Sequence, residues 1–173
     1  MTLEEARPAD APALHRLVER AYRGDTARAG WSHEADLLTG PRTSEDEIAG
    51  FIADPTRHLL VARNGEGGIC ACVLLHDKGD GLFYLGMLTV EPAIQGGGMG
   101  KGLLAAAETH ARDALGATRM EMQVFSRRRE LLAFYDRRGY RPTGERRPFP
   151  YAEWPQSGAL FDDLEFLVLE KPL

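Results

Sequence analysis

Residues 89–102 read TVEPAIQGGGMGKG and hold five of the chain's 19 glycines, at positions 96, 97, 98, 100 and 102. An average glycine usage of about 7% predicts roughly 12 glycines in a chain of this length, so the excess is mostly local. The residues before this segment have the pattern of a strand, and those after it the pattern of a helix. A glycine loop that leads into a helix N-terminus presents backbone N–H groups to an anion. The segment therefore predicts a ligand surface made of backbone.

Two common phosphate-binding patterns do not match this segment. A P-loop needs glycine at position 95 and Ser or Thr at position 102, where Gln95 and Gly102 stand. A dinucleotide fingerprint counted from Gly96 needs a third glycine at the position of Lys101, and one counted two residues later fails at Leu103. Both nucleotide-binding interpretations are therefore excluded.

The flanking sequence predicts helices and strands that alternate within one domain, residues 1–173. Helices are expected from the Asp10 cap to Gly24, from the Ser44 cap to Asp54, from Gly98 to Leu115 and from the Ser126 cap to Gly139. Strands are expected at residues 58–63, 69–76, 82–90, 119–125, from 140 onward and at 164–169. In the third helix, Leu104, Ala107, Ala111 and Ala114 are expected to face inward. This order indicates an α/β fold with a mixed sheet.

Composition excludes several functional classes. The net charge of −5 disfavours nucleic-acid binding, and no apolar run approaches the roughly 18 residues that cross a membrane. The N-terminus lacks the apolar core of a signal peptide, which favours a cytoplasmic protein. Cys70 and Cys72, at i and i+2 of a predicted strand, are expected on one face as small buried hydrophobes. They are too few for a zinc site, so we expect no metal.

Two motifs together resemble a known family. Gln95, Gly98 and Gly100 form the pattern Gln-x-x-Gly-x-Gly directly after a strand, and residues 131–140 read LLAFYDRRGY. In both, the chain resembles the GNAT superfamily of acyl-CoA-dependent N-acetyltransferases. The resemblance implies a central, mostly antiparallel sheet with a splayed parallel strand pair, flanked by about four helices. It also implies acetyl-CoA as the co-substrate and acetyl transfer to a primary amine through a tetrahedral intermediate. Homodimers are common in this family, so the resemblance allows a homodimer.

The resemblance assigns roles to individual residues. The pyrophosphate of coenzyme A would lie on Gln95, Gly96, Gly97, Gly98, Met99 and Gly100, with Lys101 as a charge partner. The backbone of Leu88, Thr89 and Val90 would face the pantetheine arm and the acetyl carbonyl. Tyr135 matches the family tyrosine that protonates the departing thiolate. The asparagine that often begins the following helix in this family is absent, and Ser126 is its candidate substitute.

The acceptor side is less determined. The family's glutamate base is absent, and the candidate bases are Tyr84, His76, Glu121, His33 and Glu34. Substrate selection is assigned to aromatic and charged residues of the loops and the strand before the glycine segment, namely Trp31, Arg42, Tyr84 and Trp154. Nine of the 21 basic residues lie between positions 119 and 147, and coenzyme A phosphates are a candidate ligand for some of them. The acceptor is expected to be a small-molecule amine or a peptide.

Three alternatives stay open at this point. One is an acetyltransferase-like protein that binds acyl-CoA without catalysis, as a sensor or an interaction module. The second is an enzyme that uses another acyl donor or an oxygen acceptor. The third, nucleic-acid binding through the arginines, conflicts with the acidic net charge.

Overall fold

The structure is a computed structural model, and it describes residues 1–28, 30 and 33–173. In this part of the chain a seven-stranded sheet has the order β1-β2-β3-β4-β5-β7-β6. The strands are β1 (Glu4–Glu5), β2 (Arg57–Arg63), β3 (Ile69–Asp77), β4 (Leu82–Val90), β5 (Arg119–Phe125), β6 (Arg141–Pro148) and β7 (Glu165–Pro172). Neighbouring strands are antiparallel except for β4 and β5, which are parallel. The mixed α/β sheet is therefore confirmed.

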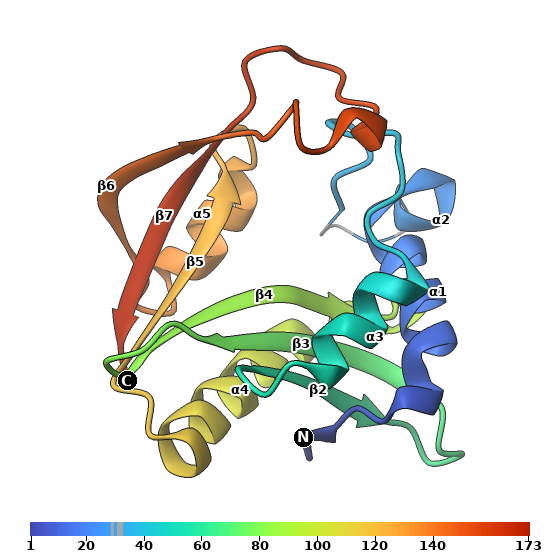
Figure 1. Cartoon of the computed structure of the whole chain (residues 1–173), viewed down its shortest axis with the longest axis vertical. Coiled ribbons are helices and arrows are strands. Elements are labelled where there is room, and N and C mark those ends of the chain that lie inside the picture. Colours follow the sequence, from blue (N-terminus) through green and yellow to red (C-terminus); the bar gives the residue numbers. More distant parts are fainter. Residues whose placement is uncertain (29, 31–32) are drawn as a thin grey trace.

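Helices cover both faces of the sheet (Figure 1). The α-helices are α1 (Ala11–Tyr22), α2 (Gly24–Arg28), α3 (Glu45–Ala53), α4 (Met99–Leu115) and α5 (Arg129–Asp136), with short 3-10 turns at Pro8–Asp10, Pro92–Ile94 and Pro155–Ser157. The apolar sides of α1 and α3 pack on one face of β2 and β3. The apolar side of α4 packs on the opposite face. The apolar sides that the sequence spacing predicts for these helices thus bury both faces of the sheet.

The two parallel strands separate soon after they begin. β4 and β5 pair only at Leu82–Arg119, Phe83–Met120 and Tyr84–Glu121. β5 instead pairs with β7 along its whole length, and β6 and β7 leave the rest of the sheet together with it (Figure 1). The implied splayed pair is confirmed, and it opens the centre of the molecule.

A bulge in β4 lies at this opening. Gly86 is opposite Leu74 and Thr89 is opposite Cys72, so Met87 and Leu88 together face one residue of β3. Met87 has a φ of +49°, which costs a residue with a side chain roughly 1–2 kcal/mol. The Thr89 hydroxyl donates to the Met87 carbonyl oxygen over 2.9 Å and helps to hold this conformation. The bulge turns the backbone of β4 toward the opening.

Most predicted elements are confirmed, including the end of the first helix, where α1 stops at Tyr22 and Gly24 has a φ of +72° before it begins α2. Three local predictions are wrong. Ala114 is exposed instead of facing inward. Ser126 is not a cap, because its N–H donates to the Glu165 carbonyl oxygen and α5 begins at Arg129. Cys70 and Cys72 face different clusters, since a bulge near Ala62 and Arg63 shifts the register of β3 between them.

Candidate active site

The glycine segment forms an open backbone loop at the start of α4. Gly96, Gly97 and Gly98 have φ angles of +107°, +53° and +84°, and a Cβ at any of them would meet nothing within 4 Å. No side chain caps α4, and its first turn carries no acidic residue. The Met99 N–H donates to the Gly96 carbonyl oxygen within the loop, and the next N–H groups of this first turn have no partner within the helix. The loop and helix end therefore fit an anionic group such as a pyrophosphate.

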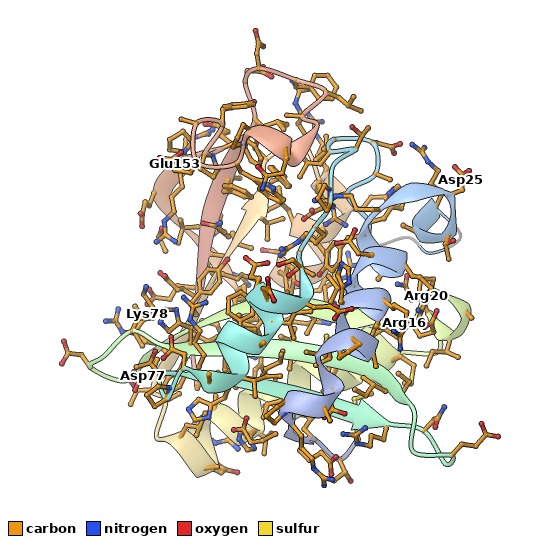
Figure 2. All side chains as sticks on the ribbon, turned by 45° about the vertical axis from the view of Figure 1, so that its right-hand side comes forward. Arg16, Arg20, Asp25, Asp77, Lys78 and Glu153 are labelled. Carbon is orange, nitrogen blue, oxygen red and sulfur yellow. The ribbon has the colours of Figure 1, made fainter. Side chains whose placement is uncertain are left out.

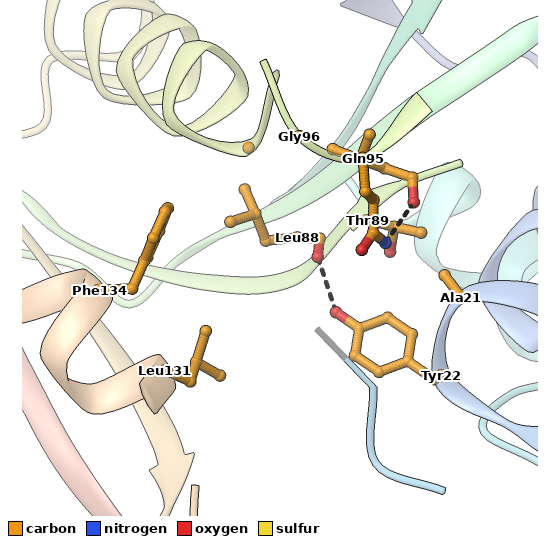
Figure 3. A pocket seen from close by; sticks show the side chains of 10 residues that line it. Ala21, Tyr22, Leu88, Thr89, Gln95, Gly96, Leu131 and Phe134 are labelled. Carbon is orange, nitrogen blue, oxygen red and sulfur yellow. Dashed lines mark hydrogen bonds between the residues drawn. The ribbon is translucent and has the colours of Figure 1, made fainter. Parts of the chain in front are cut away.

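The Gln95 side chain ties this loop to the end of β4. Its Nε2 donates to the Val90 carbonyl oxygen over 3.0 Å (Figure 3). Gln95 thus positions the loop through its side chain, while the outer surface of the loop is backbone.

A narrow slot of about 40 Å³ leads away from the loop between β4 and α5 (Figure 3). Its lining is mostly apolar and consists of Ala21, Tyr22, Leu88, Thr89, Val90, Gln95, Gly96, Gly100, Leu131 and Phe134. The Tyr22 hydroxyl donates to the Leu88 carbonyl oxygen over 2.8 Å at the far end of the slot. Burial raises the pKa of Tyr22, so this hydroxyl keeps the proton that it donates.

Tyr135 lies beyond the slot, on the side of α5 that faces the opening between β4 and β5. It is 5% exposed, and its ring packs edge-on against Phe134 and Tyr140. Burial raises its pKa well above the ordinary value of a phenol. Among the described residues none forms a hydrogen bond with its hydroxyl, so this proton is available to a ligand.

A larger cleft of about 600 Å³ occupies the other side of the opening and includes Tyr135 in its wall. Arg57, His76, Tyr84 and Glu121 are successive neighbours across β2, β3, β4 and β5, and all four line the cleft. Burial raises the pKa of Tyr84 to about 12. Burial, with Arg57 and Lys78 nearby, lowers the pKa of His76 below its ordinary value. At neutral pH this row thus offers a protonated phenol and an uncharged imidazole.

The two carboxylates of the cleft are paired with arginines. Glu34 lies 2.8 Å from Arg23 and 3.9 Å from Arg42, and Glu121 lies 3.4 Å from Arg147. Burial acts to raise the pKa of Glu34, but Arg42 and Arg23 outweigh it and hold that pKa below its ordinary value. Glu34 is therefore a poor proton acceptor near pH 7.

Two loops from distant parts of the chain meet above the cleft (Figure 1). Thr39 N–H donates to Gly158 over 3.0 Å, and Gly40 N–H donates to Ser157 over 2.7 Å. Trp154 comes from the second loop, lines the cleft and stacks on Phe149 at 5.7 Å between ring centroids. We call residues 37–40 and 157–160 the roof of the cleft.

The structure brings most of the predicted residues together. Tyr135, Arg42, Tyr84 and Trp154 line the cleft with His76, Glu121 and Glu34, whereas Leu88, Thr89, Val90, Gln95, Gly96 and Gly100 line the slot. Gly97, Gly98 and Met99 lie at the loop and helix start, with exposed Lys101 beside them. Ser126 and His33 line neither cavity, and Trp31 lies outside the described residues.

Three residues that sequence reasoning missed also contribute. Tyr22 has the spacing of a core residue of α1, and Arg23, which follows it, pairs with Glu34 inside the protein. Arg128 belongs to the arginine run and was not distinguished from its neighbours. One signal was present: the helix predicted from Ser126 contains both Arg128 and Tyr135, although in the structure Arg128 is the N-cap residue and α5 begins at Arg129.

No group of three or more His, Cys, Asp or Glu side chains able to hold a metal ion is found among the described residues. None of the helices in the described ranges is both long and apolar enough to span a membrane.

Comparison with known proteins extends these findings. A sequence model of the acetyltransferase (GNAT) family matches residues 12–140. An IAA acetyltransferase from Azospirillum brasilense is 31% identical over 166 residues, which cover 93% of this chain and 91% of that protein. The solved structure of an IAA acetyltransferase from Bacillus cereus ATCC 14579 has a TM-score of 0.70 at 18% identity and covers 99% of both chains. A spermidine N-acetyltransferase chimera from Vibrio cholerae and hSSAT has a TM-score of 0.72 at 13% identity, covering 99% of this chain and 96% of that chain. At such identities the structural matches show a shared fold.

Proposed function

Because this chain belongs to the acetyltransferase (GNAT) family, we propose that it is a single domain that transfers an acetyl group from acetyl-CoA to a primary amine of a small molecule or peptide. One observation carries the proposal: the slot leads from the open glycine loop to the bulge in β4, where Tyr135 and the cleft begin. A donor that enters from the loop would present its acyl group to an acceptor in the cleft.

The donor would be held mainly by backbone. Gly96 to Gly100 and the first turn of α4 would receive the pyrophosphate, with Lys101 adding positive charge. Leu131 and Phe134 would pack against the pantetheine arm across from β4. The backbone of Leu88, Thr89 and Val90 would face the arm and the acetyl carbonyl, and an N–H at the bulge would stabilise the oxyanion.

The chemistry is direct transfer. The neutral amine attacks the thioester carbonyl carbon and forms a tetrahedral intermediate, whose collapse breaks the C–S bond. Tyr135 gives its phenolic proton to the departing sulfur, so the products are the free thiol and the acetylated amine. The raised pKa of Tyr135 keeps it in the protonated form that this role requires.

The proton that the amine loses needs an acceptor in the cleft. Tyr84 holds its own proton because its pKa is about 12, and Glu34 is neutralised by two arginines. His76 is uncharged at neutral pH and lines the cleft beside Tyr84. We therefore assign His76 as the base, directly or through water.

The test is an acetyl-CoA-dependent thiol-release assay over amino acids, polyamines, aminoglycosides and peptide N-termini. The proposal predicts turnover with at least one amine and equal amounts of thiol and acetylated product. Tight acetyl-CoA binding with background thiol release across the whole panel would contradict it and favour a non-catalytic acyl-CoA sensor.

A further inference from the structure

The cleft is positively charged although the protein is acidic. Its ionised lining consists of two acidic side chains, Glu34 and Glu121, and five basic ones, Arg42, Arg57, Lys78, Arg128 and Arg147. The lining thus carries a formal excess of three positive charges, in a chain whose net charge is −5. Part of this excess is offset from outside the lining, because Arg57 lies 3.1 Å from Asp54 and Arg147 lies 2.9 Å from Glu145. Lys78 lies at the end of the sheet in the turn between β3 and β4 (Figure 2), so the charge extends from the centre of the cleft to its rim.

Two basic residues of this lining, Arg128 and Arg42, are incompletely neutralised. Arg128 is half-buried at the start of α5 and forms no ion pair with any described residue. Arg42 lies 5.3 Å from the centre of the Tyr22 ring and 3.9 Å from a Glu34 oxygen that Arg23 already contacts at 2.8 Å. One carboxylate is therefore shared by two arginines while Arg128 has none.

These two arginines approach the same place from different elements. Arg42 lies on the loop before α3 and Arg128 is the N-cap residue of α5, yet the charges of both act on Tyr22 and on Glu34. The charge of Arg128 also acts on Tyr135, which lies further along α5. The unpaired positive charge thus lies beside the group assigned as the acid.

This charge favours one class of amine over others. A positive environment destabilises an ammonium group, which helps the acceptor to reach its neutral, reactive form. The same environment repels a polyamine, because each additional ammonium adds a further unfavourable interaction. An acceptor that carries an oxyanion as well as the amine would instead supply the missing negative charge, and guanidinium groups bind carboxylates with two parallel hydrogen bonds.

On the basis of the proposed function, we propose that the acceptor is a small amine that also carries a carboxylate or similar oxyanion, held by Arg128 with Arg42 beside it. Arg128 is then the residue that determines acceptor specificity, and the amine of the same molecule reaches the acyl group next to Tyr135.

Matched acceptor pairs test this proposal. Thiol release is measured for each L-amino acid and for its C-terminal amide, with spermidine as a cationic probe, and kcat/KM is expressed for the neutral amine. We expect at least one amino acid to exceed its amide at least tenfold, because a hydrogen bond to a charged group contributes about 1.5–3 kcal/mol. Spermidine is expected to be a poorer acceptor than that amino acid. Amides or spermidine that react as well as the amino acids would overturn the proposal.

A variant then identifies the arginine responsible. Arg128→Gln is expected to raise KM for the amino acid roughly 10- to 100-fold and to leave its amide and acetyl-CoA almost unaffected. Arg16→Gln, an exposed arginine of α1 (Figure 2), is the matched control and should change neither constant. If Arg128→Gln raised KM for the amino acid and for its amide by the same factor, Arg128 would not be the residue that binds the carboxylate.

The proposed function and this inference fail differently. If no amine at all is acetylated, the proposed acetyl transfer is refuted. The anion site is then tested by calorimetric titration of the same amino acids into the complex of the protein with coenzyme A. Binding that Arg128→Gln abolishes supports the site, and absence of binding by the unmodified chain overturns it.

Discussion

The Tyr22 hydroxyl donates a hydrogen bond of 2.8 Å to the Leu88 carbonyl oxygen and so joins the last residue of α1 to the bulge in β4. The Met87 carbonyl oxygen of the same bulge accepts from the Thr89 hydroxyl over 2.9 Å. The same Tyr22 ring lies under Arg42, so one residue borders both the donor slot and the acceptor cleft.

Tyr22→Phe removes the hydrogen bond and keeps the ring under Arg42. We expect about 1 kcal/mol lower stability and a several-fold lower kcat/KM for acetyl-CoA, because the bulge loses the group that holds it. Thermal unfolding and initial rates measure the two effects. Unchanged values for both would show that the bulge is held without the Tyr22 hydroxyl. Tyr22→Ala should lower stability and kcat/KM further, because it also removes the ring under Arg42.

Gly98→Ala tests the backbone cradle. Its φ of +84° costs a residue with a side chain roughly 1–2 kcal/mol, so the loop should relax and acetyl-CoA should bind at least several-fold more weakly. Gly65→Ala is the control, since Gly65 lies in a turn with no positive φ and open space around it. Calorimetric titration with acetyl-CoA makes the comparison, and equal affinity for both variants would contradict a role for this loop.

Gly40→Ala tests the roof. A Cβ at position 40 would lie 1.9 Å from the backbone oxygen of Gln156, so the two loops must move apart. We expect KM for the amine to rise severalfold while KM for acetyl-CoA stays the same, because Leu38 of the roof lines the cleft and no roof residue lines the slot. Gly50→Ala on the exposed side of α3 meets nothing within 4 Å and should stabilise the protein by roughly 0.5–1 kcal/mol. A rise confined to KM for acetyl-CoA would contradict this assignment.

The pH dependence tests His76. Burial lowers its pKa below the ordinary 6.5, so the imidazole accepts a proton at neutral pH and loses that ability as the pH falls through the lowered pKa. Above this pKa, log kcat/KM for the amine should rise with pH with a slope of about one, because only the amine must lose a proton. Below it the slope should be about two, because His76 must lose a proton as well.

His76→Gln should lose this steepening. Arg57→Met removes a positive charge that lowers the His76 pKa, so the steepening should move to higher pH. An identical profile for His76→Gln and the unmodified chain would exclude His76 as the base.

The sequence predicted the elements well because their signals are local. Ser44 accepts from the Glu47 N–H at the start of α3 as its spacing indicates, and the turns around the predicted meander match the observed strands β2, β3 and β4. Two-residue β1 and five-residue α2 were missed, since neither is long enough to show a period.

The geometry of the site was predictable only in part. The glycine loop and Tyr135 belong to contiguous motifs, and the structure puts the loop at the slot and Tyr135 in the wall of the adjoining cleft. The charge of the cleft depends on which arginines find a carboxylate, and Glu34 is paired by Arg23 and Arg42 only after the loops have folded. The positive φ of Met87 has no signal in the sequence, because it arises from the pairing of β4 with β3.

Tyr135→Phe is the most direct test of the account, because it removes one oxygen from the group assigned as the acid. Single-turnover and steady-state rates are measured with acetyl-CoA and an accepted amine, together with the Kd for acetyl-CoA. Tyr151→Phe is the control, because it also removes one phenolic oxygen, with its hydrogen bonds to Phe161 and Leu164, but lines neither the slot nor the cleft. We predict a kcat lower by about 10²- to 10⁴-fold, with the Kd for acetyl-CoA unchanged. A kcat equal to that of the unmodified chain would contradict the assignment of Tyr135 as the acid that releases the thiol.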